Sequence, residues 1–248
     1  MKIKLSDIST RAPKDIEKEE GKEKLASILE ELDELQNLLF AEGKNSVLVV
    51  IQGMDAAGKD GAIRKVFGAL NPQGISVTSF KVPTAEEIAH DFLWRIHQHT
   101  PAKGVIKIFN RSHYENVLVT RVHKDIDDET AHERMEAMND FEKLLHKHNN
   151  TLILKFYLHI SREEQTERLN ERLTDERKHW KANPNDFKEA EHWDEYMKYY
   201  EEIFEKCDYV PWTIVPANQN WYKELIIAKT LRDELKKLKM QYPKLENE

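Results

Sequence analysis

The junction between an apolar run and a glycine loop restricts the possible fold more than any other part of this sequence. Val47 to Ile51 contains only aliphatic residues, which is typical of a strand buried on both faces of a parallel sheet. Residues 53–60 then read Gly-Met-Asp-Ala-Ala-Gly-Lys-Asp, and a helical pattern runs from Asp60 to Leu70. A strand, a G-x-x-x-x-G-K loop and a helix in this order predict a phosphate site rather than an incidental glycine turn.

The loop supplies phosphate ligands of two kinds. Its glycines let the backbone turn so that N–H groups point at an anion, and the following helix adds the positive end of its dipole. Lys59 is expected to reach the terminal phosphates as a mobile charge. The phosphate-binding residues expected here are Gly53, Ala56, Ala57, Gly58, Lys59, Asp60 and Gly61.

Two carboxylates make this loop unusual. Asp60 occupies the position where a Ser or Thr hydroxyl normally meets Mg²⁺, and Asp55 lies inside the loop. Carboxylates repel phosphates unless a divalent cation lies between them, so we expect Mg²⁺ or Mn²⁺ with oxygen ligands and Asp55 as one of them. For Asp60 the alternative is that it only caps the helix.

A second polar cluster follows the strand predicted at 105–109. In this kind of fold a later strand usually ends in an acidic residue near the Mg²⁺, but here it ends in Asn110. Glu115 is therefore the candidate for the missing carboxylate and second metal ligand. Arg111 and Arg121 are candidates for phosphate binding. The alternative is that Arg111, Glu115 and Arg121 form surface ion pairs.

Strand and helix patterns alternate along the whole chain, which predicts one doubly wound α/β domain over 1–248 with a mainly parallel sheet. We expect an N-terminal arm and helix at 1–45 and a polar lid segment at 175–192. The helices are expected at 22–40, 60–70, 84–99, within 111–122, and at 128–148, 193–206 and 220–239. The strands are expected at 47–51, 75–80, 105–109, 151–159 and 212–215.

The lid and the helix before it carry further cations. Arg168 and Arg172 lie four residues apart, so they share one helix face and are candidates for lining a phosphate channel. The alternative is that the interleaved glutamates Glu164, Glu167 and Glu171 only pair with them.

Composition and missing motifs exclude several classes of protein. The chain of 248 residues has a net charge of −7, so a generally basic surface for nucleic acid is not indicated. No apolar run spans a bilayer, no signal core precedes the domain and the single Cys207 forms no internal disulfide, which together predict a cytoplasmic protein. The chain lacks the Asn-Lys-x-Asp box of GTPases and the His-Arg-Asp and Asp-Phe-Gly motifs of protein kinases.

Four motifs in order resemble polyphosphate kinase family 2. They are residues 53–61, Phe109-Asn110-Arg111-Ser112-His113-Tyr114-Glu115, Lys178-His179-Trp180-Lys181 and Pro211-Trp212. The resemblance implies a P-loop NTPase-like three-layer sandwich with a helical lid, similar to thymidylate kinase. It also implies Mg²⁺-dependent, reversible transfer of phosphate from inorganic polyphosphate to AMP or ADP, giving ADP or ATP.

The same resemblance assigns roles to single residues. Asp55 would orient the metal and the acceptor phosphate, and Lys59 and Arg111 would bind phosphates at the transfer point. Arg64 would lie on the adjacent helix, with Lys178 and Lys181 in the lid. The form with Asn110 resembles the branch that accepts both AMP and ADP. Family members are often homo-oligomers, so a dimer or tetramer is expected.

Two other functions stay open from the sequence. One is an ATP-dependent nucleoside monophosphate kinase of the same fold, in which polyphosphate plays no part. The other is a non-catalytic nucleotide-binding module that docks through the amphipathic helix from Leu25 to Leu39. The intact Lys59 and the carboxylate of Asp55 argue against the second of these.

Overall fold

A five-stranded sheet forms the centre of the computed structural model, which describes residues 3–245. The first two and last three residues of the expected domain lie outside this range. The sheet contains β1 (Ser46–Gln52), β2 (Ile75–Ser79), β3 (Ile106–Asn110), β4 (Thr151–His159) and β5 (Trp212–Pro216). The strand order is β2-β3-β1-β4-β5, and every pairing is parallel.

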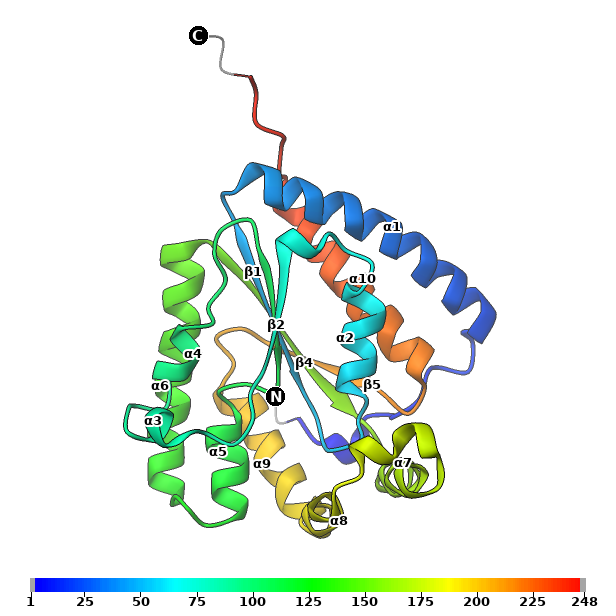
Figure 1. Ribbon diagram of the computed structural model, residues 1–248, viewed down its shortest axis with the longest axis vertical. Coiled ribbons are helices and arrows are strands. Elements are labelled where there is room, and N and C mark those ends of the chain that lie inside the picture. The colour runs from blue at the N-terminus through cyan, green and yellow to red at the C-terminus, as the bar shows by residue number, and fades with distance from the viewer. Residues whose placement is uncertain (1–2, 246–248) are drawn as a thin grey trace.

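Helices cover both faces of this sheet, which Figure 1 shows nearly edge-on. On one face lie α1 (Lys18–Glu42), α2 (Lys59–Phe67) and α10 (Asn220–Lys237). On the other lie α4 (Trp94–His97), α5 (Glu115–Val122), α6 (Asp128–Asn149) and α9 (Trp193–Lys206). The predicted three-layer α/β sandwich with a parallel sheet is confirmed.

The central strand β1 explains why the glycine loop lies where it does. Its residues Val47 to Ile51 are fully buried because β3 and β4 flank it and helices cover both faces. Parallel strands place all their carboxyl ends at one edge of the sheet, so the loop after β1 and the residues after β3 meet there. This edge is the position at which open parallel sheets bind ligands.

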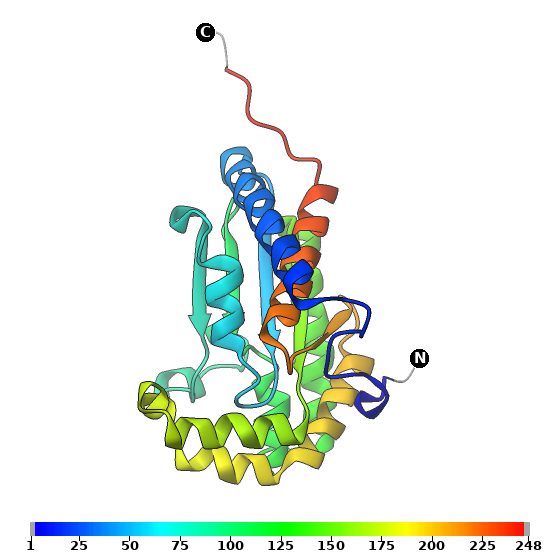
Figure 2. The ribbon, with the colours of Figure 1, turned by 90° about the vertical axis from the view of Figure 1, so that its right-hand side faces the viewer.

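The segment expected to form a lid lies across the same edge. It consists of the 3₁₀ turn η3 (Glu176–Lys181) and α8 (Pro184–Glu191), and it follows α7 (Arg162–Thr174). Figure 2 shows these elements, with α9, lying across the end of the molecule toward which the strands point. Pro184 begins α8, where its fixed φ and missing N–H suit a first helical turn.

One predicted helix is divided in two. Residues 84–99 form α3 (Ala85–Ile88) and α4, with a turn between them. Thr84 and Glu87 form a reciprocal capping box at the start of α3. The side chain of Asp91 accepts a hydrogen bond from the backbone N–H of Leu93 at 2.9 Å, and such local bonds compete with the helix.

The N-terminal arm packs more closely than its polar sequence indicates. The 3₁₀ turn η1 (Leu5–Asp7) buries Leu5, whose N–H donates to the carboxylate of Glu201 at 2.8 Å. A second 3₁₀ turn, η2 (Pro72–Gly74), connects α2 with β2. Within residues 3–245, no helix is long and apolar enough to cross a membrane.

Candidate phosphate-transfer site

Two glycines of the loop stand where a side chain would not fit. Gly53 has φ +151°, and a Cβ there would lie 2.9 Å from the carbonyl oxygen of Leu158. Gly58 has φ +89°, and its Cβ would lie 2.2 Å from Nζ of Lys223. Both conformations strain an L-residue, so glycine is required at these positions. Gly61 lies in open space, and no such requirement applies there.

Lys59 begins α2 and turns back over the loop. Its Nζ donates to the carbonyl oxygens of Gly53 at 2.8 Å and Met54 at 3.1 Å. Burial, together with the nearby charge of Arg111, lowers the pKa of Lys59 to about 8, although Asp55 opposes this shift. The ammonium group is therefore held without a salt bridge to a carboxylate, at the position where a phosphate would bind.

Arg111 forms ion pairs with both carboxylates that are predicted from the sequence to be metal ligands. Its guanidinium binds the carboxylate of Asp55, and Nη1 donates to Oε2 of Glu115 at 3.2 Å. Glu115 and Asp55 raise the pKa of Arg111 above its usual value, so the group stays charged. The two carboxylates thus converge on one cationic group. Carboxylate oxygens are the donors that a hard divalent ion such as Mg²⁺ or Mn²⁺ prefers, but residues 3–245 contain no group of three or more His, Cys, Asp or Glu side chains placed to hold such an ion.

The residues between Arg111 and Glu115 are anchored in the core. Arg111 has φ +62°, and its N–H donates to the carbonyl oxygen of Ile51 at 3.1 Å. Tyr114 is fully buried, and its hydroxyl donates to Glu142 at 2.6 Å. Lys155 Nζ donates to Glu142 at 2.9 Å and to the Tyr114 hydroxyl at 2.9 Å. A buried polar group therefore fixes the segment that carries Arg111.

Asp60 does not cap α2. The N-cap of that helix is Gly58, and no side-chain cap bond is formed there. Instead Asp60 accepts a hydrogen bond from the Asn110 amide at 2.8 Å and lies 3.3 Å from Lys181 Nζ in η3. These contacts outweigh the opposing effect of burial and lower the pKa of Asp60. Asp60 therefore connects the phosphate loop with β3 and with the segment above it.

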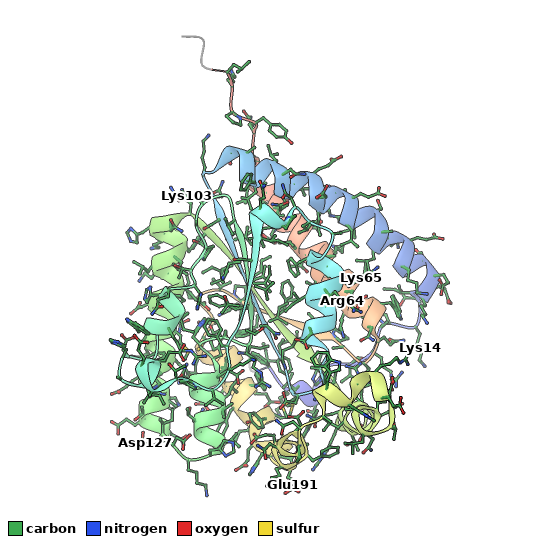
Figure 3. All side chains as sticks on the ribbon, in the orientation of Figure 1. Lys14, Arg64, Lys65, Lys103, Asp127 and Glu191 are labelled. Carbon is green, nitrogen blue, oxygen red and sulfur yellow. The ribbon has the colours of Figure 1, made fainter. Side chains whose placement is uncertain are left out.

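The loop opens into a cavity of about 760 Å³ between α2, α7, η3 and α10. Ten basic side chains line it, against four acidic ones, although the chain as a whole is acidic. The basic residues are Lys59, Arg64, Lys65, Lys81, Arg111, Arg168, Arg172, Lys178, Lys181 and Lys223. The acidic residues are Asp55, Asp60, Glu171 and Glu224. Figure 3 labels Arg64 and Lys65 on α2. Such a cleft concentrates anions.

Most of the predicted site residues lie at this cavity. Gly53 and Glu115 instead line a smaller pocket, together with Asp55 and Arg111, and Ala57 lines neither. Arg121 also lies away from both. It is not among the lining residues, and its guanidinium is buried between Asp128, at 2.6 Å, and Glu202, at 2.8 Å, over the ring of Tyr199. The prediction that Arg121 binds phosphate is therefore corrected. Its position on α5 directs it toward α6 and α9, where it stabilises helix packing.

The two arginines of α7 have different environments. Arg168 donates to the carbonyl oxygens of Ala56 at 3.0 Å and of Ala217 and Asn218 at 2.9 Å, so it fastens the phosphate loop to the chain before α10. Arg172 donates to Asp186 of α8 at 2.5 Å. Both line the cavity. Arg168 also pairs with Glu164, as the alternative interpretation expected, whereas the partner of Arg172 is Asp186 and none of the interleaved glutamates.

Several residues of the site were missed by sequence reasoning, among them the cavity-lining Lys65, Lys81 and Lys223 and the lid residue Asp186. Lys223 of α10 lies against the phosphate loop. Its only signal in the sequence is a lysine among the apolar residues of a helix. Asp186 has a raised pKa because of burial and the nearby negative charge of Asp55. No local sequence pattern indicates that Asp186 lies near Asp55, because the two residues are far apart in the sequence and only the fold brings α8 close to the phosphate loop.

Comparison with known proteins agrees with this geometry. The family model described as polyphosphate kinase 2 matches residues 15–243. The chain belongs to the polyphosphate kinase 2 family. It is 46% identical over 231 residues to the AMP/ADP-polyphosphate phosphotransferase of Meiothermus ruber, covering 92% of this chain and 86% of that protein. It is 41% identical to the ADP-polyphosphate phosphotransferase of Rhodopseudomonas palustris, covering 91% and 83%.

A solved structure shows the same fold. The crystal structure of polyphosphate kinase 2 from Arthrobacter aurescens TC1 superposes with a TM-score of 0.95 at 41% sequence identity. The match covers 99% of this chain and 89% of that one. The resemblance first recognised from four short motifs thus extends over nearly all of this chain.

Proposed function

We propose that this protein transfers phosphate reversibly between inorganic polyphosphate and nucleotides, converting AMP to ADP and ADP to ATP. The observation that carries this proposal is the cavity beside the phosphate loop, in which ten basic side chains gather in a chain of net charge −7. A single nucleotide phosphate can contact only a few of these basic side chains, whereas a long polyanion can contact many of them. The acceptors are inferred from the names of the relatives in Meiothermus ruber and Rhodopseudomonas palustris.

Positioning and charge neutralisation are sufficient for this reaction. A terminal oxygen of the nucleotide phosphate attacks the last phosphorus of polyphosphate, and the anhydride bond to the rest of the chain breaks. The shortened polyphosphate leaves with the bridging oxygen and its negative charge. Lys59 and Arg111 lie where they would stabilise the charge on the transferred group, and no covalent intermediate is needed.

Asp55 and Glu115 are the proposed ligands of Mg²⁺ or Mn²⁺. Their carboxylates meet at Arg111, which supports a shared cation position beside the loop. The bound ion would neutralise charge on the phosphate oxygens and orient them. Asn110 holds Asp60 through a hydrogen bond of 2.8 Å. Asn110 therefore contributes to the site by orienting a carboxylate of the loop.

We also propose that residues 175–192 act as a lid. Two ion pairs support this role, because Lys181 reaches Asp60 of the phosphate loop and Asp186 of α8 reaches Arg172 of α7. Lys178 pairs with Glu171 at 2.5 Å. Phosphate would replace these carboxylates as the partner of each cation, and the closed segment would exclude water that hydrolyses polyphosphate. A cytoplasmic homo-oligomer stays a prediction.

One assay tests the function. The purified protein is incubated with Mg²⁺, polyphosphate and either AMP or ADP, and the nucleotides are separated. We expect ADP and ATP to form. A parallel incubation with AMP and with ATP as donor in place of polyphosphate tests the nucleoside monophosphate kinase. Product only with the ATP donor would refute the polyphosphate reaction, and binding of nucleotide without any product would favour the non-catalytic module.

Polyphosphate affinity should fall as pH rises above about 8, because only the protonated amine of Lys59 attracts phosphate and its pKa is about 8 in the free protein. Below pH 8 the amine is already charged, so affinity should change little there. Above it, each pH unit should weaken binding by up to about tenfold for this one group. Calorimetry from pH 7 to 9.5, in buffers of different ionisation enthalpy, should show proton uptake on binding. A flat affinity across this range would contradict the prediction.

A further inference from the structure

Lys223 is a buried cation that forms no salt bridge with any residue of 3–245, although the charges of Glu224 and Glu164 oppose the lowering of its pKa by burial. It is the fourth residue of α10, and only 1% of its surface is exposed. Its one recorded hydrogen bond goes from Nζ to Oδ1 of Asn220, at 2.6 Å. An ammonium group has three donors, so this bond leaves most of its capacity unused. Lys223 also lies near the N-terminus of α10, where the positive end of the helix dipole destabilises the charged ammonium group.

Three other buried cations of the described residues differ in this respect. Lys155 pairs with Glu142 at 2.9 Å, Arg121 with Asp128 at 2.6 Å and Arg95 with Glu87 at 3.0 Å. Within residues 3–245, the buried cations that form no salt bridge are Lys59 and Lys223. A buried charge without a counterion is costly, and such groups gather at functional sites.

Lys223 and Lys59 lie against different parts of the same loop, Lys223 at Gly58 and Lys59 at Gly53 and Met54. The Nζ of Lys223 lies 2.2 Å from the point where a Cβ of Gly58 would stand, and the guanidinium of Arg168 lies 3.5 Å from that point. Burial and the charge of Arg168 lower the pKa of Lys223 to about 8, the value also found for Lys59. Two buried lysines that form no salt bridge within residues 3–245 therefore contact the phosphate loop, and nearby carboxylates, among them Asp55 and Glu224, oppose the fall in their pKa.

We propose that Lys223 is a second phosphate-binding lysine of the loop, which holds the polyphosphate chain next to the group bound by Lys59. This role rests on the proposed function. The cavity continues from Lys223 along α2 to Arg64 and Lys65. A nucleoside monophosphate has one phosphate and cannot span this array, whereas a chain of phosphates can. Lys223 thus contacts the donor and not the nucleotide acceptor.

The substitution Lys223→Met tests this role, because methionine keeps most of the buried volume and removes the charge. We expect the Kd for polyphosphate to rise about tenfold to a hundredfold, as for one lost hydrogen bond to a charged group. The KM for AMP at saturating polyphosphate should stay within about twofold of wild type, since a contact to the donor alone is lost. The Tm of the free protein should rise, because an unpaired buried charge is removed.

Lys229→Met on the same helix is the matched control. Lys229 is exposed and pairs with Asp233 at 2.9 Å, outside the cavity lining. Its polyphosphate affinity should equal that of wild type. The assigned role is overturned if Lys223→Met binds polyphosphate as tightly as the control, or if its affinity for AMP falls in parallel. A wild-type protein that binds no polyphosphate overturns the proposed function itself, and this role with it.

Discussion

Asp55→Asn should lower kcat for phosphate transfer by about 100- to 1,000-fold, as does removal of one preorganised electrostatic group at other active sites. The change keeps the shape of the side chain but removes a charge that binds Arg111 and that we propose as a metal ligand. The fold should persist, because Asp55 lies in the loop and is partly exposed. Single-turnover kinetics with polyphosphate and ADP, together with thermal unfolding, would measure both effects.

The control for this variant is Asp194→Asn, the same chemical change at an exposed position. The side chain of Asp194 is 91% exposed and lies 4.0 Å from Arg162, so its kcat and Tm should match wild type. Full activity of Asp55→Asn would contradict both the metal role and the catalytic role of this carboxylate. A large fall in Tm would instead assign the effect to folding.

Glu142→Leu should destabilise the folded protein by about 3–5 kcal/mol, the cost of leaving a buried charge without its partner. Glu142 is fully buried and accepts hydrogen bonds from Lys155 at 2.9 Å and Tyr114 at 2.6 Å. Its loss leaves the ammonium group of Lys155 in the core. Because Tyr114 anchors the segment that begins at Arg111, kcat should fall as well. Urea unfolding at pH 7 would give the change in free energy.

The double variant Glu142→Leu with Lys155→Met distinguishes two causes of the lost stability. One is the charge of Lys155 left without a counterion, and the other is the altered packing at position 142. Removing both charges should recover most of the lost stability, since apolar replacements of a buried ion pair are often neutral or stabilising. Equal destabilisation of the single and double variants would show that Glu142 acts through packing alone. The double variant should still have reduced kcat if the hydrogen bond from Tyr114 is what positions Arg111.

The fold was predictable because its signals are local and agree with one another. Val47 to Ile51 reads as a fully buried strand, and the structure buries all of it between two parallel neighbours. The glycine loop follows directly, so the position of Lys59 was fixed by the motif alone. The helix expected at 84–99 was wrong in its middle, because the side chain of Asp91 competes there for a backbone N–H.

The residues of the candidate site could be predicted only where they lie in or beside a recognisable sequence motif. Lys59, Asp55 and Arg111 lie in or beside recognisable motifs, and the structure brings them together. Arg121 was misplaced because its spacing from Arg111 does not reveal that the helix turns it toward Asp128 and Glu202. Lys223 was missed because it lies far from the phosphate loop in the sequence. Its contact with Gly58 joins residues 165 positions apart, and no spacing rule predicts such a contact.

Two ion pairs connect the proposed lid, residues 175–192, with the rest of the site, and they would make polyphosphate binding an exchange of counterions. Lys181 would give up Asp60, and Arg172 of α7 would give up Asp186 of the lid, as phosphate oxygens arrive. Each step replaces one ionic contact with another, so neither cation passes through a bare state. The net gain per phosphate would then be small, because a carboxylate contact is lost for each phosphate contact that forms.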